Sequence, residues 1–224
     1  PKNIAQAKVV SQVLNQFSKE DLDNSNTAII LADEGLLFPV LNQLPKKVKA
    51  LNVTMGSPLQ NTPLFALIDA FISMHIQAYE YKKSSFYYKD VIRLLGHPFF
   101  AKICCKQDLS QIKNSINKDN FVFVTPSWIQ KQLTDKSLQQ LFELWEKPDD
   151  GIISLQLLIQ LLRKPLVGKK GTIESEVLLV FSECLNILEK LINELKKDFQ
   201  LKTLQKILKQ LLAKEVIPFK GEPL

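Results

Sequence analysis

The sequence is short of arginine and glycine, and each shortage excludes a class of site. Only two of its 29 basic residues are Arg, namely Arg93 and Arg163. Because the guanidinium group is the side chain best suited to clamp a transferring phosphoryl group, the chain is a poor candidate for phosphoryl transfer. The seven glycines all stand singly, so the sequence has no G-x-x-x-x-G-K-[ST] loop to hold a triphosphate. We therefore expect no cofactor in this chain.

Cysteine and histidine are equally scarce. Cys104 and Cys105 are adjacent and Cys184 stands alone, which gives neither a disulfide framework nor a C-x-x-C metal motif. His75 and His97 have no acid or Cys cluster nearby in the sequence, so we interpret them as core or surface histidines and expect no metal. The apolar runs are too short to cross a bilayer. These features predict a cytoplasmic chain without a membrane partner.

The length and the net charge of the chain exclude fewer functions. The 224 residues, 46% of them hydrophobic, suit one large or two small domains with a real core. The net charge of +6 is compatible with a polyanionic partner but does not require one, because 23 acids are mixed with the bases. The chain lacks an initiator Met and ends in Gly221-Glu222-Pro223-Leu224. We therefore expect an internal piece of a longer protein.

The first eighty residues have the pattern of an α/β domain. Apolar spacing and caps predict, in order, a helix over 5–17, a strand over 27–32, a helix over 33–44, a strand over 48–55 and a helix over 62–81. This is the order of one βαβ unit. We expect residues 27–32 and 51–55 to be neighbouring parallel strands, with the right-handed crossover that such units use.

The rest of the chain is mainly helical. Its predicted elements are a short helix over 88–95, a lone strand over 121–124, helices over 172–195 and 201–212, and a strand over 216–219. The expected fold class is therefore mainly α with a small α/β part. We predict three segments: a partial α/β domain at 1–81, a helical insertion at 82–215, and a return to the same sheet at 216–224.

This interrupted layout resembles the second motor domain of UvrD-like superfamily 1 helicases, which an all-helical subdomain interrupts. The matching segments are residues 27–44, 51–56, 62–79 and 90–98. Within them, Leu31-Ala32-Asp33-Glu34 and Asn52-Val53-Thr54-Met55-Gly56 look closest to large Bacteroidetes proteins of the PD-(D/E)XK nuclease superfamily. Those proteins resemble the AddB partner of AddAB-type complexes, and residues 217–224 resemble the point where such chains rejoin the motor domain.

The resemblance implies a partial P-loop-NTPase-like motor domain with an all-helical insertion. It implies a scaffold or DNA-positioning piece of an ATP-dependent DNA helicase and exonuclease, acting in DNA end processing and recombinational repair. ATP and Mg²⁺ would belong to this parent hydrolase, DNA would be reached through it, and a helicase subunit would be the partner. The piece itself would not be catalytic. Ala32-Asp33-Glu34 stands where active helicases have an Arg near the nucleotide, a departure that agrees with degenerate AddB-like motors.

Two places are candidate sites. Residues 196–214 contain six Lys and one acid, and Lys202, Lys206 and Lys209 share one helical face. That face either follows a DNA backbone without sequence preference or is simply solvated. By the resemblance, Thr54, Met55 and Gly56 form a turn near the interface with the first motor domain; the alternative is an ordinary turn that ends a strand.

A third motif and a rival function complete the expectations. Pro148-Asp149-Asp150-Gly151 has the PD half of the nuclease signature, but no second acid and Lys follow on a strand, and we interpret it as a turn. The first rival function is a helical protein-interaction module without a DNA role. The second is an enzyme whose site would need an apolar pocket with converging polar groups.

Overall fold

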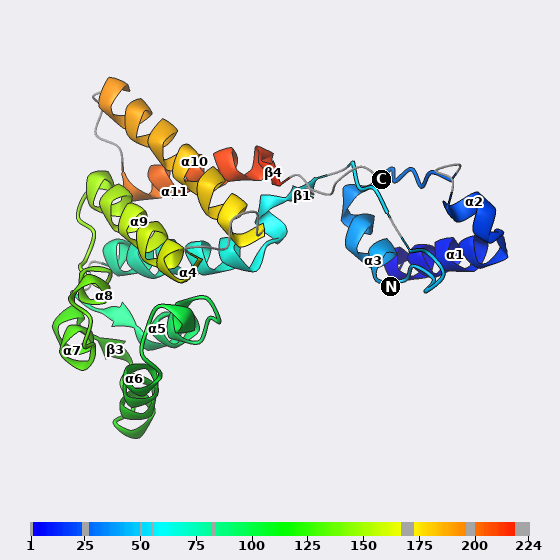
Figure 1. Cartoon of the computed structure of the whole chain (residues 1–224). Coiled ribbons are helices and arrows are strands. Elements are labelled where there is room, and N and C mark those ends of the chain that lie inside the picture. The colour runs from blue at the N-terminus through cyan, green and yellow to red at the C-terminus, as the bar shows by residue number, and fades with distance from the viewer. Residues whose placement is uncertain are drawn as a thin grey trace. The chain divides into compact units, whose positions relative to one another are not determined.

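The computed structural model describes residues 2–23, 27–49, 51–54, 56–81, 84–166, 173–195 and 200–217. Over these residues the chain is mainly α-helical, as the sequence predicted, and its described strands are only two residues long (Figure 1). The chain divides into two compact units. One comprises residues 1–57 and 216–224, and the other residues 58–215.

The first unit contains α1 (Lys2–Gln16), α2 (Lys19–Asp23), the 3-10 helix η1 (Glu34–Leu36) and α3 (Leu37–Leu41). Helix α1 contacts α3 and η1. Leu14 is buried, but Val9, Val13 and Phe17 are exposed, so the apolar face predicted for this helix is only partly covered. The helix predicted over 33–44 is shorter than expected, because it consists of one 3-10 turn and the five residues of α3.

The two strands predicted for this unit do not form among the described residues. Residues 27–32 and 51–54 have no regular secondary structure, and no described strand lies beside them. A strand exists only where a neighbour pairs with its backbone groups, so an apolar run alone does not make one. The side chain of Ile30 is accordingly 93% exposed, although the run 27–32 was expected to be buried.

The second unit is a helical assembly whose elements follow closely on one another. In chain order they are β1 (Ser57–Pro58), η2 (Leu59–Asn61), α4 (Pro63–Glu80), β2 (Phe86–Tyr87), α5 (Tyr88–Leu95), η3 (Phe100–Lys102), α6 (Lys106–Lys118), β3 (Phe123–Val124), α7 (Pro126–Gln132), α8 (Lys136–Gln140), α9 (Pro148–Arg163), η4 (Lys164–Leu166), α10 (Ile173–Leu195) and α11 (Leu201–Lys214). Strand β4 (Val216–Ile217) follows α11 and pairs with β1.

Helix α4 is the centre of this unit. Thr62 caps it by accepting a hydrogen bond from the Phe65 amide, and Pro63 occupies its first turn, as the sequence predicted. Most of its faces are apolar, as is usual for a helix that is surrounded by other elements. It contacts α5, β2 and α11, and Phe65 meets Phe181 of α10 at 6.3 Å between ring centroids. Its ten buried residues are Leu64, Leu67, Ile68, Ala70, Phe71, Ile72, Met74, His75, Ile76 and Ala78.

Apolar stripes determine how the remaining helices pack. Helix α10 buries Val177, Phe181, Cys184 and Leu188, and α11 buries Leu201, Leu204, Leu208 and Leu212. These stripes pack α9, α10 and α11 together, on one side of α4 in Figure 1. Helices α5 to α8 follow one another in contact beyond the other side of it. The burial of α4 also explains why residues 58–81 belong with the helices, whereas the sequence analysis placed them in the first domain.

Both ends of the helical unit meet. The Leu59 amide donates a hydrogen bond to the Glu215 carbonyl at 3.0 Å, next to the pairing of β1 with β4. The chain therefore leaves the first unit after Ser57 and returns to it at Val216. Strand β4 was expected in or near the sheet of strands 27–32 and 51–55; that sheet does not form among the described residues, and β4 pairs with Ser57–Pro58. Residues 218–219 of that predicted strand lie outside the described residues.

Candidate functional site

The lysine face predicted on α11 lies against α4. The Lys209 ammonium is 2.6 Å from a carboxylate oxygen of Asp69, and the Lys202 ammonium is 2.7 Å from one of Glu80. The hydrogen bond to Glu80 raises the pKa of Lys202 above its usual value, so this side chain stays charged. Between the two ion pairs, the Gln205 side chain reaches the Ser73 hydroxyl at 3.5 Å. The three contacts form a polar seam along two helices that run in opposite directions.

This seam changes what the lysine face can do. Two of its three predicted members already neutralise acids of α4, and an ion-paired lysine contributes less to phosphate binding than an unpaired one. Lys206 is exposed, and no ion pair among the described residues includes it. Residues 196–199 of the lysine-rich stretch lie outside the described residues. The sequence pattern located the cations correctly on one face but contained no sign of the acids opposite.

The structure says less about the role of the other candidate residues. Thr54 is exposed and Gly56 half-buried, in a stretch without regular secondary structure, and Met55 lies outside the described residues. Pro148-Asp149-Asp150-Gly151 forms the first turn of α9, not the free turn that we predicted. The Asp150 carboxylate accepts hydrogen bonds from the amides of Glu146 and Lys147, so its chemistry is that of a helix cap.

The two-stranded ribbon of β2 and β3 was missed by the sequence analysis, which expected a lone strand at 121–124. Phe86 pairs with Val124 and Tyr87 with Phe123 in antiparallel register. Phe86 and Val124 are buried, whereas the Phe123 side chain is 43% exposed. Since successive side chains of a strand point to opposite faces, the ribbon turns one pair inward and displays Tyr87 and Phe123 outward. A signal was present in the aromatic run at 86–88.

Cations accompany these displayed rings. The Lys89 ammonium lies 6.0 Å from the centre of the Tyr87 ring and 5.9 Å from that of Tyr88. Lys89 and Arg93 are both exposed and are one turn apart on α5. At the end of the same helix face, the Lys113 ammonium is 3.9 Å from the position that a β-carbon would take at Gly96. Within the described residues, none of these three cations is in an ion pair.

His75 lies in the core. Its ring stacks on Trp145 with centroids 4.2 Å apart and planes 5° apart. Its Nε2 is 3.0 Å from the Leu141 carbonyl, which can only accept, so Nε2 carries the proton of the neutral ring. Burial lowers the pKa of His75 to about 3, although the bond to Leu141 opposes this shift. The side chain is therefore uncharged at neutral pH.

Neither buried cysteine, Cys104 or Cys184, is an activated nucleophile. Burial raises the pKa of the Cys104 thiol to about 12 and that of Cys184 to about 11, with nearby acids adding to both shifts. Nucleophilic cysteines need the opposite shift. The residues that the structure describes also hold no group of three or more His, Cys, Asp or Glu side chains placed to bind a metal.

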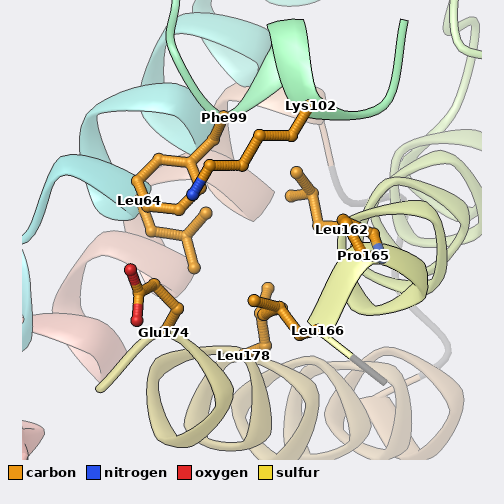
Figure 2. A pocket seen from close by; sticks show the side chains of 8 residues that line it. All are labelled: Leu64, Phe99, Lys102, Leu162, Pro165, Leu166, Glu174 and Leu178. Carbon is orange, nitrogen blue, oxygen red and sulfur yellow. The ribbon is translucent and has the colours of Figure 1, made fainter. Parts of the chain in front are cut away.

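The hollow shown in Figure 2 is apolar, with Lys102 and Glu174 as its only charged lining residues. Its volume of about 10 Å³ is at the limit for one water molecule, whereas small-molecule sites enclose roughly 300–1,000 Å³. It therefore has no room for a substrate. Its lining residues are Leu64, Phe99, Lys102, Leu162, Pro165, Leu166, Glu174 and Leu178.

Comparison with known proteins adds no relative. No protein-family model, no curated protein and no solved structure matches the chain. None of the helices in the described ranges is both long enough and apolar enough to cross a membrane.

Proposed function

We propose that this chain is a non-catalytic scaffold within a DNA-processing protein of the UvrD-like helicase and nuclease kind, and that its helical unit positions DNA. The observation that carries the proposal is the path of the chain. Residues 58–215 form one unit whose ends are joined by the bond from Leu59 to Glu215, and the residues on both sides group together. An α/β domain interrupted by helices is the layout that the sequence resemblance implies. ATP and Mg²⁺ would be bound by other parts of the parent protein.

The exposed apolar segments of the first unit support this proposal. Ile30 is 93% exposed and Leu51 46% exposed, in two stretches that were predicted as strands and have no regular secondary structure. Each Å² of apolar surface left in water costs about 25 cal/mol, so such residues are usually covered. Neighbouring strands of a larger α/β domain would cover them and pair with their backbone groups. The exposure therefore agrees with a unit that forms part of a larger sheet.

The proposed role predicts weak binding of DNA that does not depend on sequence and falls steeply with salt, because the contact would rest on counterion release from phosphates. The test is a titration of fluorescent duplex and single-stranded DNA with the full chain at several salt concentrations. Replacing Lys202, Lys206 and Lys209 together by Gln would remove up to about three phosphate contacts if all three met DNA. Since Lys202 and Lys209 are ion-paired, we expect the salt slope to fall by only about one. Absence of binding at low salt would refute the proposal.

The rival function, a helical protein-interaction module, is favoured by one specific observation. The ion pairs from Lys202 to Glu80 and from Lys209 to Asp69 give these lysines a structural role that needs no DNA. The module predicts that the triple substitution lowers stability and leaves any affinity for DNA unchanged. The same titration, combined with thermal unfolding of both proteins, separates the two functions.

A further inference from the structure

Three aromatic rings lie together at the outer face of the β2–β3 ribbon and the first turn of α5: Phe123 is exposed, and Tyr87 and Tyr88 are half-buried. Tyr87 and Phe123 are directly paired across the ribbon, with ring centroids 6.0 Å apart. Tyr88, the first residue of α5, meets Tyr87 edge to face at 5.0 Å. The Val122 side chain beside them is 55% exposed. We call Tyr87, Tyr88 and Phe123 the aromatic patch; it is held in place from below by the buried pair Phe86 and Val124.

A row of cations leads away from this patch. Lys89 lies over two of its rings, Arg93 follows one turn later on α5, and the Lys113 ammonium lies by Gly96 at the end of that helix. The only acid of α5 is Asp90, which is half-buried and interacts with Arg93. Desolvation raises the pKa of its carboxyl, and the charge of Arg93 opposes this shift. The surface thus combines displayed rings with positive charge.

From this arrangement we infer that the aromatic patch is a stacking platform for the bases of single-stranded nucleic acid, with Lys89, Arg93 and Lys113 following the phosphate backbone. Sites of this kind pair aromatic faces, on which successive bases stack, with a positively charged track for the phosphates. A duplex keeps its bases stacked inside the helix and cannot offer them to the rings. The inference rests on the proposed function and adds to it the form of DNA and the residues that meet it.

The experiment measures fluorescence anisotropy of a labelled thymidine oligonucleotide and of an abasic oligonucleotide of the same length, each titrated with the full chain. The abasic strand keeps the phosphates but offers nothing to stack. The double variant Tyr87→Leu/Phe123→Leu keeps apolar side chains and removes two rings. Phe17→Leu, at a 38% exposed position in the other unit, is its matched control. Thermal unfolding identifies any variant that does not fold.

We expect the double variant to bind the thymidine strand at least about tenfold more weakly, with unchanged affinity for the abasic strand, because stacking contributes about that factor per base. Phe17→Leu should change neither affinity, and Tyr87→Phe, which keeps its ring, should bind like the unaltered chain. Should the double variant unfold, Tyr87→Leu and Phe123→Leu are measured singly and should each weaken binding of the thymidine strand.

The cation row is tested separately. Lys89→Gln/Arg93→Gln should weaken binding of both strands and reduce the salt slope for both, since it removes phosphate contacts and leaves the rings. Lys136→Gln, an exposed lysine at the start of α8, is the matched control and should change nothing.

Each opposing outcome has a definite meaning. Equal affinity of the unaltered chain for the two strands, with no loss in the double variant, would overturn the platform while leaving DNA binding intact. If the double variant lost affinity for duplex DNA and for the thymidine strand to the same degree, the preference for single strands would be overturned. Failure of the unaltered chain to bind any of these DNAs would refute the proposed function and the platform with it, and would leave the patch as a surface for a protein partner.

Discussion

The Lys209 ammonium lies 2.6 Å from the Asp69 carboxylate and so joins α11 to α4 across the helical unit. Both side chains are partly exposed, so the pair is weak, and we expect Lys209→Gln to lower the free energy of unfolding by about 0.2–1 kcal/mol. The effect should shrink in 1 M salt, because screening removes most of the attraction. Lys206→Gln is the control, since no ion pair among the described residues includes Lys206. Equal losses for the two variants in urea unfolding would contradict a specific pair.

His75 predicts a pH dependence of stability. Its pKa is about 3 in the folded chain and about 6.5 in the unfolded chain, so between these values the unfolded state binds the extra proton. Stability is therefore complete above about pH 6.5 and is lost as the pH falls toward 3. From pH 6.5 to pH 5 we expect a loss of about 1.5 kcal/mol from this residue.

The variant His75→Phe isolates this contribution. It keeps a ring against Trp145 but removes the titrating group and the bond to Leu141. It should be less stable at pH 7 and should show a flatter dependence between pH 5 and pH 6.5. Burial also lowers the pKa of His97, whose contribution has the same sign and remains in both proteins. Urea unfolding at several pH values measures the difference, and identical slopes would show that His75 is solvated.

We predict that residue 151 must be glycine, because a larger side chain would crowd its neighbours. A β-carbon there would lie 3.2 Å and 3.3 Å from two atoms of the Trp145 ring and 3.5 Å from Leu204. The ring is stacked on His75 and has little freedom to move away. Alanine would gain about 1 kcal/mol of helix propensity, but crowding in a packed core costs about 1–3 kcal/mol. We expect Gly151→Ala to lower the midpoint of thermal unfolding, and a raised midpoint would mean that the ring gives way.

Much of the helical unit could be predicted from the sequence, because its signals are local. The cap of the helix over 62–81 and the helix over 88–95 were located correctly, and the helix predicted over 172–195 corresponds to α10. Periodicity and capping depend on neighbours in the sequence, which are always present. The strand at 216–219 was predicted too, and its described part is strand, although its partner differs from the one expected.

The failures concern pairings between distant residues. Strands at 27–32 and 51–55 were inferred from composition, but pairing depends on a neighbour that composition does not specify. The acids facing Lys202 and Lys209 are more than 120 residues away in the sequence, and so no local pattern could reveal these ion pairs. The ribbon of β2 and β3 likewise joins residues 86–87 to residues 123–124. The sequence could therefore identify residues of the candidate site, but not the surface that they form together.

The path of the chain predicts that residues 58–215 fold alone. Their ends are held together by the bond from Leu59 to Glu215, so cutting at 57 and 216 leaves no long strained connection. Their core is built around α4 and contains most of the fully buried large side chains. We expect the isolated segment to unfold cooperatively in circular dichroism, within about 5 °C of the corresponding transition in the full chain. Gradual unfolding without a cooperative transition would contradict an autonomous unit.

The central claim is that the helical unit is the part that positions DNA, and its most direct test compares the segment 58–215 with the full chain. The measurement is the dissociation constant for a fluorescent single strand at four salt concentrations. The account predicts that the segment binds within about threefold of the full chain and with the same salt slope, because the phosphate contacts lie within it. A folded segment that fails to bind a strand held by the full chain would contradict the claim.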